Sequence, residues 1–188
     1  RFNAPSRKYF VYGGLIISSC YLLFTFFNKR IIDTHFRKTL DVNQVAGNDF
    51  ITTPTPLNNL LWYNLAKSND GFFIGYRSIC DTKPITEITF VPRNDSLLGD
   101  LKNDPGVKKL IRFSQDYYCI TKSDSGGINF HDMRFGQIGG WVNPQAAFVF
   151  TYHIEENDNN RASINQGRFE AATGEAFKSL IERIKGID

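Results

Sequence analysis

The feature that most constrains this chain is an uncharged run of nineteen residues near its beginning, from Tyr9 to Phe27, which reads YFVYGGLIISSCYLLFTFF. As an α-helix the run is about 28 Å long, which matches the hydrocarbon core of a bilayer. Both ends of the run are closed by basic residues, namely Arg7, Lys8, Lys29 and Arg30. The sequence therefore predicts a transmembrane helix with basic flanks over residues 1–27.

Two other kinds of segment share this pattern: a cleavable secretory signal peptide and a buried hydrophobic helix. The run is longer than the apolar part of a typical signal peptide, and no Ala-x-Ala-like cleavage site follows it. We therefore favour the membrane span. Because basic residues flank both ends in similar number, the positive-inside rule does not predict on which side of the membrane the rest of the chain lies.

The composition favours one globular domain with an appendage. The chain has 188 residues, of which 41% are hydrophobic, which is enough apolar material for one sizeable core. The formal net charge is only +3, and the basic residues are scattered among acidic ones, so we expect no nucleic-acid partner. Three cysteines without a short Cys-x-x-Cys spacing indicate neither a disulfide framework nor a zinc ribbon.

The residues after the run predict a juxtamembrane helix over 28–48 and a soluble α+β domain over 49–188. Apolar residues at roughly helical spacing extend the span, and Gly47 is expected to end the helix. The segment 51–59 contains two prolines and is expected to be an extended lead-in. Residues 60–67 and 72–80 are apolar runs separated by Ser-Asn-Asp-Gly, which is a strong hairpin signal.

The remaining elements complete the predicted order βββαβββα. A third strand is expected over 85–93, and Asp104-Pro105 is typical of a helix start. Alternating patterns predict three more strands, over 117–122, 128–136 and 148–156. Residues 157–167 are polar and predict a loop, and Thr173 is expected to cap a last helix. We therefore predict an antiparallel sheet of about six strands with helices packed on one face.

No local catalytic signature is present, so the catalytic residues are unknown and no metal ligand is predicted. His35, His131 and His153 are far apart in sequence, so we do not expect these three histidines to form a metal site. In a strand with strict alternation, Asp132 and Arg134 lie on the same face as Ile128 and Phe130. Two opposite charges on an apolar face indicate a structural ion pair, a bulge that turns them outward, or a binding site, and we favour the first two.

Further candidates are aromatic residues and strand ends. Trp62, Tyr76 and Trp141 suit either a core or the wall of a pocket, with the core favoured. Residues at strand ends, such as Asp81, Arg93 and Asn94, often meet ligands, although turns use the same residue types. The predicted binding residues are Asp132, Arg134, Arg93 and Trp62.

Several segments, in order, resemble the C-terminal region of bacterial membrane-bound metal-dependent hydrolases. They are ITTPTPLNNLLWYNLAKSNDGFFIGYRSICD from Ile51, PRN from Pro92, KKLIRFSQDYY from Lys108 and HDMRFG from His131. In that family the His and Asp metal ligands lie in a multi-helix membrane part that precedes this region, and nothing here matches them. The resemblance therefore implies no cofactor in this chain and a divalent metal in the full-length protein. It also implies the bacterial inner membrane as location, with the bilayer and preceding transmembrane helices of the same protein as partners.

Two hypotheses of function follow. In the first, this chain, which starts at Arg1 and not at a methionine, is the C-terminal accessory domain of such a hydrolase and is inactive alone. In the second, it is a membrane-anchored module that binds a small ligand or a protein, without catalytic activity. A self-contained enzyme that uses His131, Asp132 and Arg134 ranks last.

Overall fold

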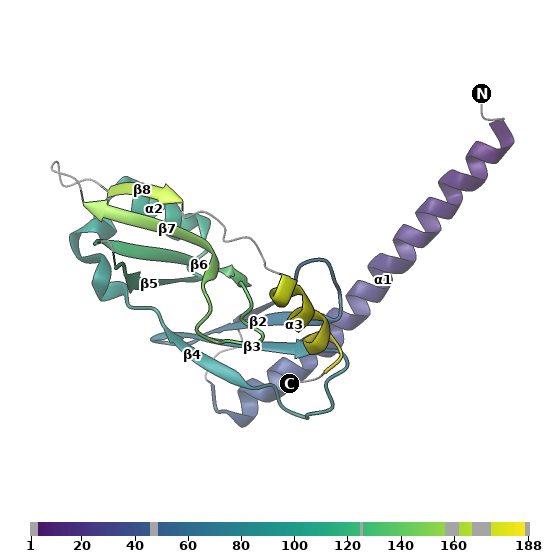
Figure 1. Cartoon of the computed structure of the whole chain (residues 1–188), viewed down its shortest axis with the longest axis horizontal. Coiled ribbons are helices and arrows are strands. Elements are labelled where there is room, and N and C mark those ends of the chain that lie inside the picture. The colour runs from purple at the N-terminus through teal and green to yellow at the C-terminus, as the bar shows by residue number, and fades with distance from the viewer. Residues whose placement is uncertain (1–3, 46–48, 125, 157–161, 167–173, 187–188) are drawn as a thin grey trace.

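One long helix and two β-sheets form most of the structure, a computed structural model that describes residues 4–45, 49–124, 126–156, 162–166 and 174–186. Helix α1 runs unbroken for 39 residues, Ala4–Val42. Its first half stands clear of the rest of the molecule, whereas its second half lies against a sheet (Figure 1). The two halves of α1 therefore have different surroundings.

The first half of α1 is long and apolar enough to cross a membrane, and no part of its most apolar stretch is buried against the rest of the chain. The second half buries Ile32, Phe36 and Leu40. These three residues are four positions apart, so they share one helix face. The predicted juxtamembrane helix thus continues the first half directly, ending at Val42, whereas the predicted terminator Gly47 lies outside the described residues.

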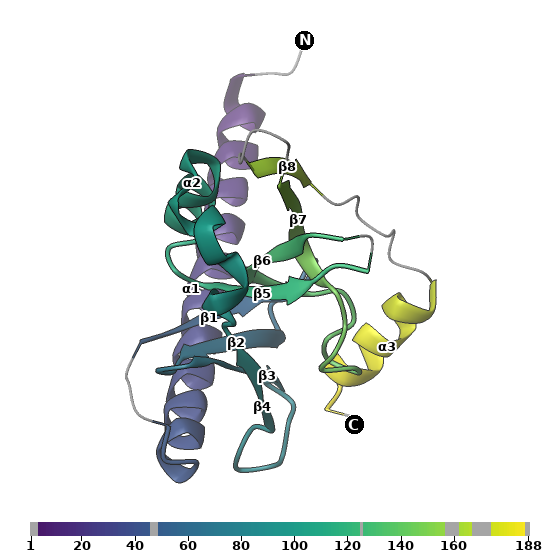
Figure 2. The same ribbon diagram turned by 90° about the vertical axis from the view of Figure 1, so that its left-hand side faces the viewer.

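The first sheet contains four antiparallel strands in the order β1-β2-β3-β4. Their bounds are β1 Phe50–Pro54, β2 Leu61–Lys67, β3 Gly71–Ser78 and β4 Ile88–Pro92. The predicted hairpin joins β2 to β3, and the Ser68 amide donates to the Gly71 carbonyl at 2.8 Å. Helix α1 covers one face of this sheet, and α3 (Gly174–Ile184) lies on the opposite side of it (Figure 2).

The second sheet also has four antiparallel strands, in the order β5-β6-β7-β8. Their bounds are β5 Tyr118–Lys122, β6 Ile128–Gln137, β7 Phe148–Glu156 and β8 Ala162–Gln166. A 3-10 helix, η1 (Asp95–Asn103), and helix α2 (Pro105–Phe113) cover its outer face. The predicted start of α2 is confirmed, because the Asp104 carboxylate accepts a hydrogen bond from the Gly106 amide at 2.7 Å.

Because side chains alternate along the strands, the apolar residues form three clusters, each between two neighbouring layers of helix or sheet. Phe73 packs toward α1, whereas its neighbours Phe72 and Ile74 pack between the two sheets. Tyr118 and Ile120 of β5 face η1 and α2. The molecule is therefore layered in the order α1, first sheet, second sheet, and η1 with α2.

The predicted α+β class is confirmed, but the described residues form eight strands in two sheets instead of about six in one. Both missed strands are edges. Strand β1 lies in the expected lead-in, where Pro54 is tolerated at the end of an edge strand. Strand β8 lies in the expected loop, and its polar, partly exposed residues give little hydrophobic alternation. The helices also cover outer faces of both sheets and not one face of a single sheet.

Helix α3 confirms the predicted last helix, while its expected cap, Thr173, lies outside the described residues. Of its apolar stripe, Leu180 is buried, whereas Phe177 and Ile181 are largely exposed. Apolar packing therefore holds only part of α3, and polar contacts hold it to the first sheet.

Candidate functional site

Two of the four predicted binding residues, Asp132 and Arg134, form an ion pair on β6. The Arg134 Nη2 lies 2.6 Å from the Asp132 Oδ2, and Nε donates to Oδ1 at 3.0 Å. The Arg134 amide also donates to Oδ1, and Asp132 is fully buried. The pairing register of β6 with β7 shifts between Asp132 and Gln137, so the pair stands where the strand becomes irregular.

The Arg134 guanidinium also lies over two aromatic rings. It lies 5.0 Å from the ring centroid of Phe113 at the end of α2, and 5.3 Å from that of Phe135. The hydrogen bonds to Asp132 raise the pKa of Arg134 above its ordinary value. Asp132 and Arg134 therefore link β6 to α2, which is a structural role, and their binding role stays a prediction.

The other two predicted residues lie elsewhere in the fold. Arg93 stacks over Phe72 of the first sheet and Tyr118 of the second, at 5.2 and 5.0 Å, and therefore bridges the sheets. Trp62 is 1% exposed, with the Lys29 ammonium of α1 6.0 Å from its ring centroid. The four predicted residues do not form one site.

His131 is a nearly buried histidine between two threonines. Its Nε2 lies 2.9 Å from the Thr121 hydroxyl, and its Nδ1 lies 2.9 Å from the Thr151 hydroxyl. Burial lowers the pKa of His131 from 6.5 to about 4. The imidazole is therefore neutral near neutral pH, and its two hydroxyl partners are those of a structural histidine.

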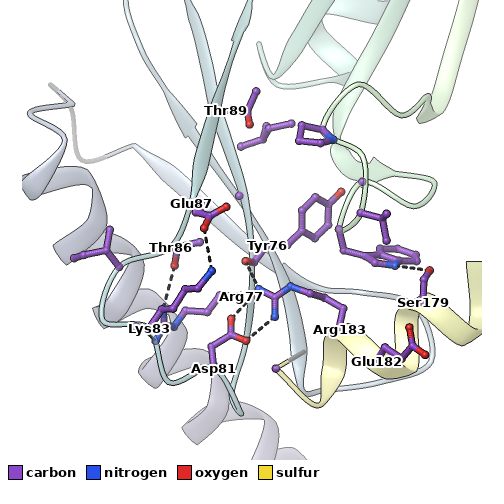
Figure 3. Close-up of a pocket in the computed structure, with 18 of the residues that line it drawn as sticks. Tyr76, Arg77, Asp81, Lys83, Thr86, Glu87, Thr89, Ser179, Glu182 and Arg183 are labelled. Atoms are coloured by element: carbon purple, nitrogen blue, oxygen red, sulfur yellow. Dashed lines mark hydrogen bonds and ion pairs between the residues drawn. The ribbon is translucent and has the colours of Figure 1, made fainter. Parts of the chain in front are cut away.

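A cavity of about 510 Å³ lies between β3, the start of β4, the turn before β7 and α3. Figure 3 shows its charged and aromatic walls. The lining residues used below are Tyr76, Arg77, Asp81, Trp141, Glu182 and Arg183. Its volume suits a small molecule.

An ion pair attaches α3 to the end of β3 and shapes one wall of the cavity. The Arg183 guanidinium contacts both carboxylate oxygens of Asp81, at 2.5 and 2.9 Å, and donates to the Tyr76 carbonyl at 3.1 Å. Asp81 also accepts from the Ser78 amide at 2.9 Å, so a contact within its own turn holds the carboxylate as well. The Ser78 hydroxyl donates in turn to the Ile184 carbonyl at 2.5 Å.

Aromatic side chains form another part of the wall. The Tyr76 and Trp141 rings meet edge to face with centroids 6.2 Å apart. The Trp141 indole donates to the Ser179 hydroxyl at 3.1 Å, and the Tyr76 hydroxyl accepts from the Gln137 amide at 3.2 Å. Only a glycine fits at Gly140, because an added Cβ would collide with the Tyr76 hydroxyl. Burial raises the pKa of Tyr76 far above its ordinary value, so the phenol is neutral.

The cavity offers a buried cation as well. Arg77 is 3% exposed and donates to the Lys83 carbonyl at 2.8 Å. Its burial lowers the pKa of Arg77, although Asp81 opposes this shift. Neither a histidine nor a cysteine is among the described residues that line the cavity. The buried guanidinium of Arg77 and the ion pair beside it suit binding of a small polar molecule.

Of the residues that line this cavity, the sequence indicates Tyr76 and Trp141 as aromatic residues with the core favoured, and Asp81 as a strand-end residue, whereas it does not indicate Arg77 or the residues on α3. Ser179 and Arg183 gave no signal, because Arg183 meets Asp81 across 102 positions of sequence. Only the fold brings these residues together.

The described residues do not fit a divalent metal. Nowhere among them do three His, Cys, Asp or Glu side chains come together in a group that could hold a metal ion. Comparison of the chain with known protein families, curated proteins and solved structures finds no match. The resemblance to membrane-bound hydrolases therefore stays a prediction.

If Asp132 is structural, Asp132→Asn should lower the free energy of unfolding by about 3 kcal/mol, because Arg134 would lose its buried counter-charge. Urea unfolding in detergent, followed by the fluorescence of Trp62 and Trp141, measures this. The control Glu87→Gln breaks the exposed pair with Lys83 and should change the value by less than about 0.5 kcal/mol. An Asp132→Asn protein of unchanged stability that had lost a ligand would instead assign Asp132 to a site.

His131 should make the domain less stable in acid. The unfolded histidine binds a proton below about pH 6.5, whereas the folded one binds it only near pH 4, so stability is full above pH 6.5 and falls as the pH is lowered toward 4. The loss approaches about 3 kcal/mol. Unfolding of wild type and His131→Gln at a series of pH values measures it. His35 is present in both proteins, so any difference between them comes from His131. If the free energy of unfolding changes with pH equally in both, His131 is not the group that lowers stability in acid.

Proposed function

We propose that this chain is a membrane-anchored accessory domain, in which the first half of α1 spans a bilayer and the rest holds a binding surface at the membrane. The observation that carries the proposal is the continuity of α1. Its exposed, apolar first half continues without a break into a second half that is part of the domain core. Exposed apolar surface of this extent is costly in water and favourable in lipid.

Polar contacts where α1 meets the first sheet support a fixed arrangement of anchor and domain. The Asn28 side chain donates to the Asn59 carbonyl at 2.8 Å, and Asn59 donates to the Thr25 hydroxyl at 2.8 Å. The next residue of α1, Lys29, donates to the Thr52 carbonyl at 3.2 Å. A domain attached in this way, without a flexible linker, keeps one orientation relative to its anchor.

The resemblance supports a more specific form of the proposal. In this form the chain is the C-terminal accessory domain of a bacterial inner-membrane hydrolase, and the metal ligands lie in transmembrane helices upstream of Arg1. The accessory domain would cover the membrane site or present a substrate to it. Such a role requires a fixed orientation, which the continuous helix provides.

The second candidate is a membrane-anchored ligand-binding module, and the cavity beside α3 favours it. A cavity of about 510 Å³ with a buried guanidinium, an ion pair and an aromatic wall has the features of a site for a small polar ligand. This function does not require a metal site in a longer protein.

The anchor is tested by placing charges in the first half of α1. Ile17 and Leu22 are 72% and 65% exposed, and no part of the domain contacts the stretch that holds them. Ile17→Arg with Leu22→Arg should therefore release the protein from vesicles in an alkaline carbonate wash, because each charge costs about 3 kcal/mol in the bilayer. Wild type and the control Val142→Arg, altered in the domain, should stay bound. Release of the wild type would contradict the proposal.

Metal content separates the two candidates. If the hydrolase form is correct, a longer protein that includes the upstream sequence should contain zinc, manganese or iron after purification in detergent, and this chain should contain none. Elemental analysis of both proteins in parallel gives the answer. Metal in neither would favour the binding module, whereas stoichiometric metal in this chain would overturn the accessory role.

A further inference from the structure

The loop between β1 and β2 presents a large apolar side chain to solvent. Leu57 is 94% exposed and has a φ of 62°. This left-handed conformation is strained for leucine and favours glycine or asparagine. With Pro56 before it, the turn has the residue order of a type II turn, in which the second central position usually holds Gly. Leu57 thus combines a strained backbone conformation with an apolar side chain that lies almost fully in water.

The loop is held against α1 at the end of the apolar run. Its residue Asn59 accepts a hydrogen bond from Asn28 and donates one to Thr25, both at 2.8 Å. Thr25 belongs to the last turn of the uncharged run, and Asn28 is the first residue after it. Figure 1 shows the loop, in dark blue, beside the point where α1 leaves the domain. Leu57 therefore lies near the level at which the proposed span ends.

The loop is also preorganised. The Asn58 side chain donates to the Thr55 hydroxyl at 2.6 Å and accepts from the amides of Leu60 and Leu61 at 2.9 and 2.8 Å. These bonds satisfy polar groups of the turn within the loop. Moving the tip out of water therefore requires little further ordering of the backbone.

The loop and the two strands that it joins carry almost no charge. The sequence from Phe50 to Ala66 contains no Asp, Glu, Lys or Arg. On α1, Phe24 and Phe27 are 48% and 61% exposed, so apolar side chains continue along the helix to the level of the loop. No ionised group of this segment would have to lose its water.

We infer that the tip of the β1–β2 loop enters the bilayer beside α1, with Leu57 at the boundary between headgroups and hydrocarbon. The inference rests on the proposed function, because it requires that α1 spans the membrane. A single span leaves the domain free to rotate about the helix axis. A second lipid contact away from that axis fixes the face that the domain, and with it the cavity, turns toward the membrane.

Spin labels at three single cysteines test this contact. Cys20→Ser and Cys80→Ser remove the exposed thiols, and Cys119 stays because it is buried. Into this background Ile17→Cys reports the middle of the span, Leu57→Cys the loop, and Lys122→Cys the exposed end of β5. The whole chain is reconstituted in phosphatidylcholine–phosphatidylglycerol vesicles. Collision of each label with oxygen, which concentrates in lipid, is then compared with collision with a water-soluble nickel chelate.

The ratio of collisions with oxygen to collisions with the nickel chelate should be clearly higher for the label at Leu57 than for the label at Lys122. It should be lower than the ratio for the label at Ile17. If Ile17 favours oxygen while Leu57 behaves like Lys122, the loop lies in water and this inference is wrong, although the anchor stands. If Leu57 is shielded from both reagents, another protein segment or a second copy covers it, which also overturns the lipid contact. If the label at Ile17 collides more with the nickel chelate than with oxygen, the first half of α1 lies in water and the proposed membrane anchor is wrong.

Discussion

The folded domain depends on the packing of the second half of α1 against the first sheet. Ile32 and Phe36 are fully buried there and supply the cover that a sheet with two apolar faces needs. The same helix continues outward as the exposed apolar segment. Because backbone hydrogen bonds run unbroken through both halves, the helix needs no cap where its surroundings change. Support of the core and the proposed attachment to a membrane thus belong to one element, and a break in α1 would disturb both.

The second sheet depends on the first through the core between them, where Phe72 and Ile74 meet Tyr117, Cys119 and Met133. Arg93 adds a polar link, because its guanidinium stacks on one ring from each sheet. Helix α3 is attached differently, mainly through its ion pair with the end of β3 and hydrogen bonds at its carboxyl end. The cavity therefore has one wall built from the core of the fold and one wall held by polar contacts.

Local signals in the sequence predicted the elements well, and long-range geometry was beyond them. The uncharged run, the Ser68–Gly71 turn and the Asp104-Pro105 helix start each depend on neighbouring residues, and all three are present as helix or turn. The Asp132–Arg134 pair was also predictable, because residues two apart share a strand face. Edge strands were missed because they bury little and pair on one side only. The cavity was missed as a site because Asp81 and Arg183 are brought together only by the fold.

The continuity of α1 also has a mechanical consequence. A helix that is rigid through the membrane surface acts as a lever, so any tilt of the span is passed to the domain in full. Membrane helices tilt by about 20° on average and adjust that angle to bilayer thickness, and such a tilt swings a point about 30 Å from the pivot by about 10 Å. With the first half of α1 in a bilayer, as proposed, the thickness of the membrane would set the height of the second sheet above it.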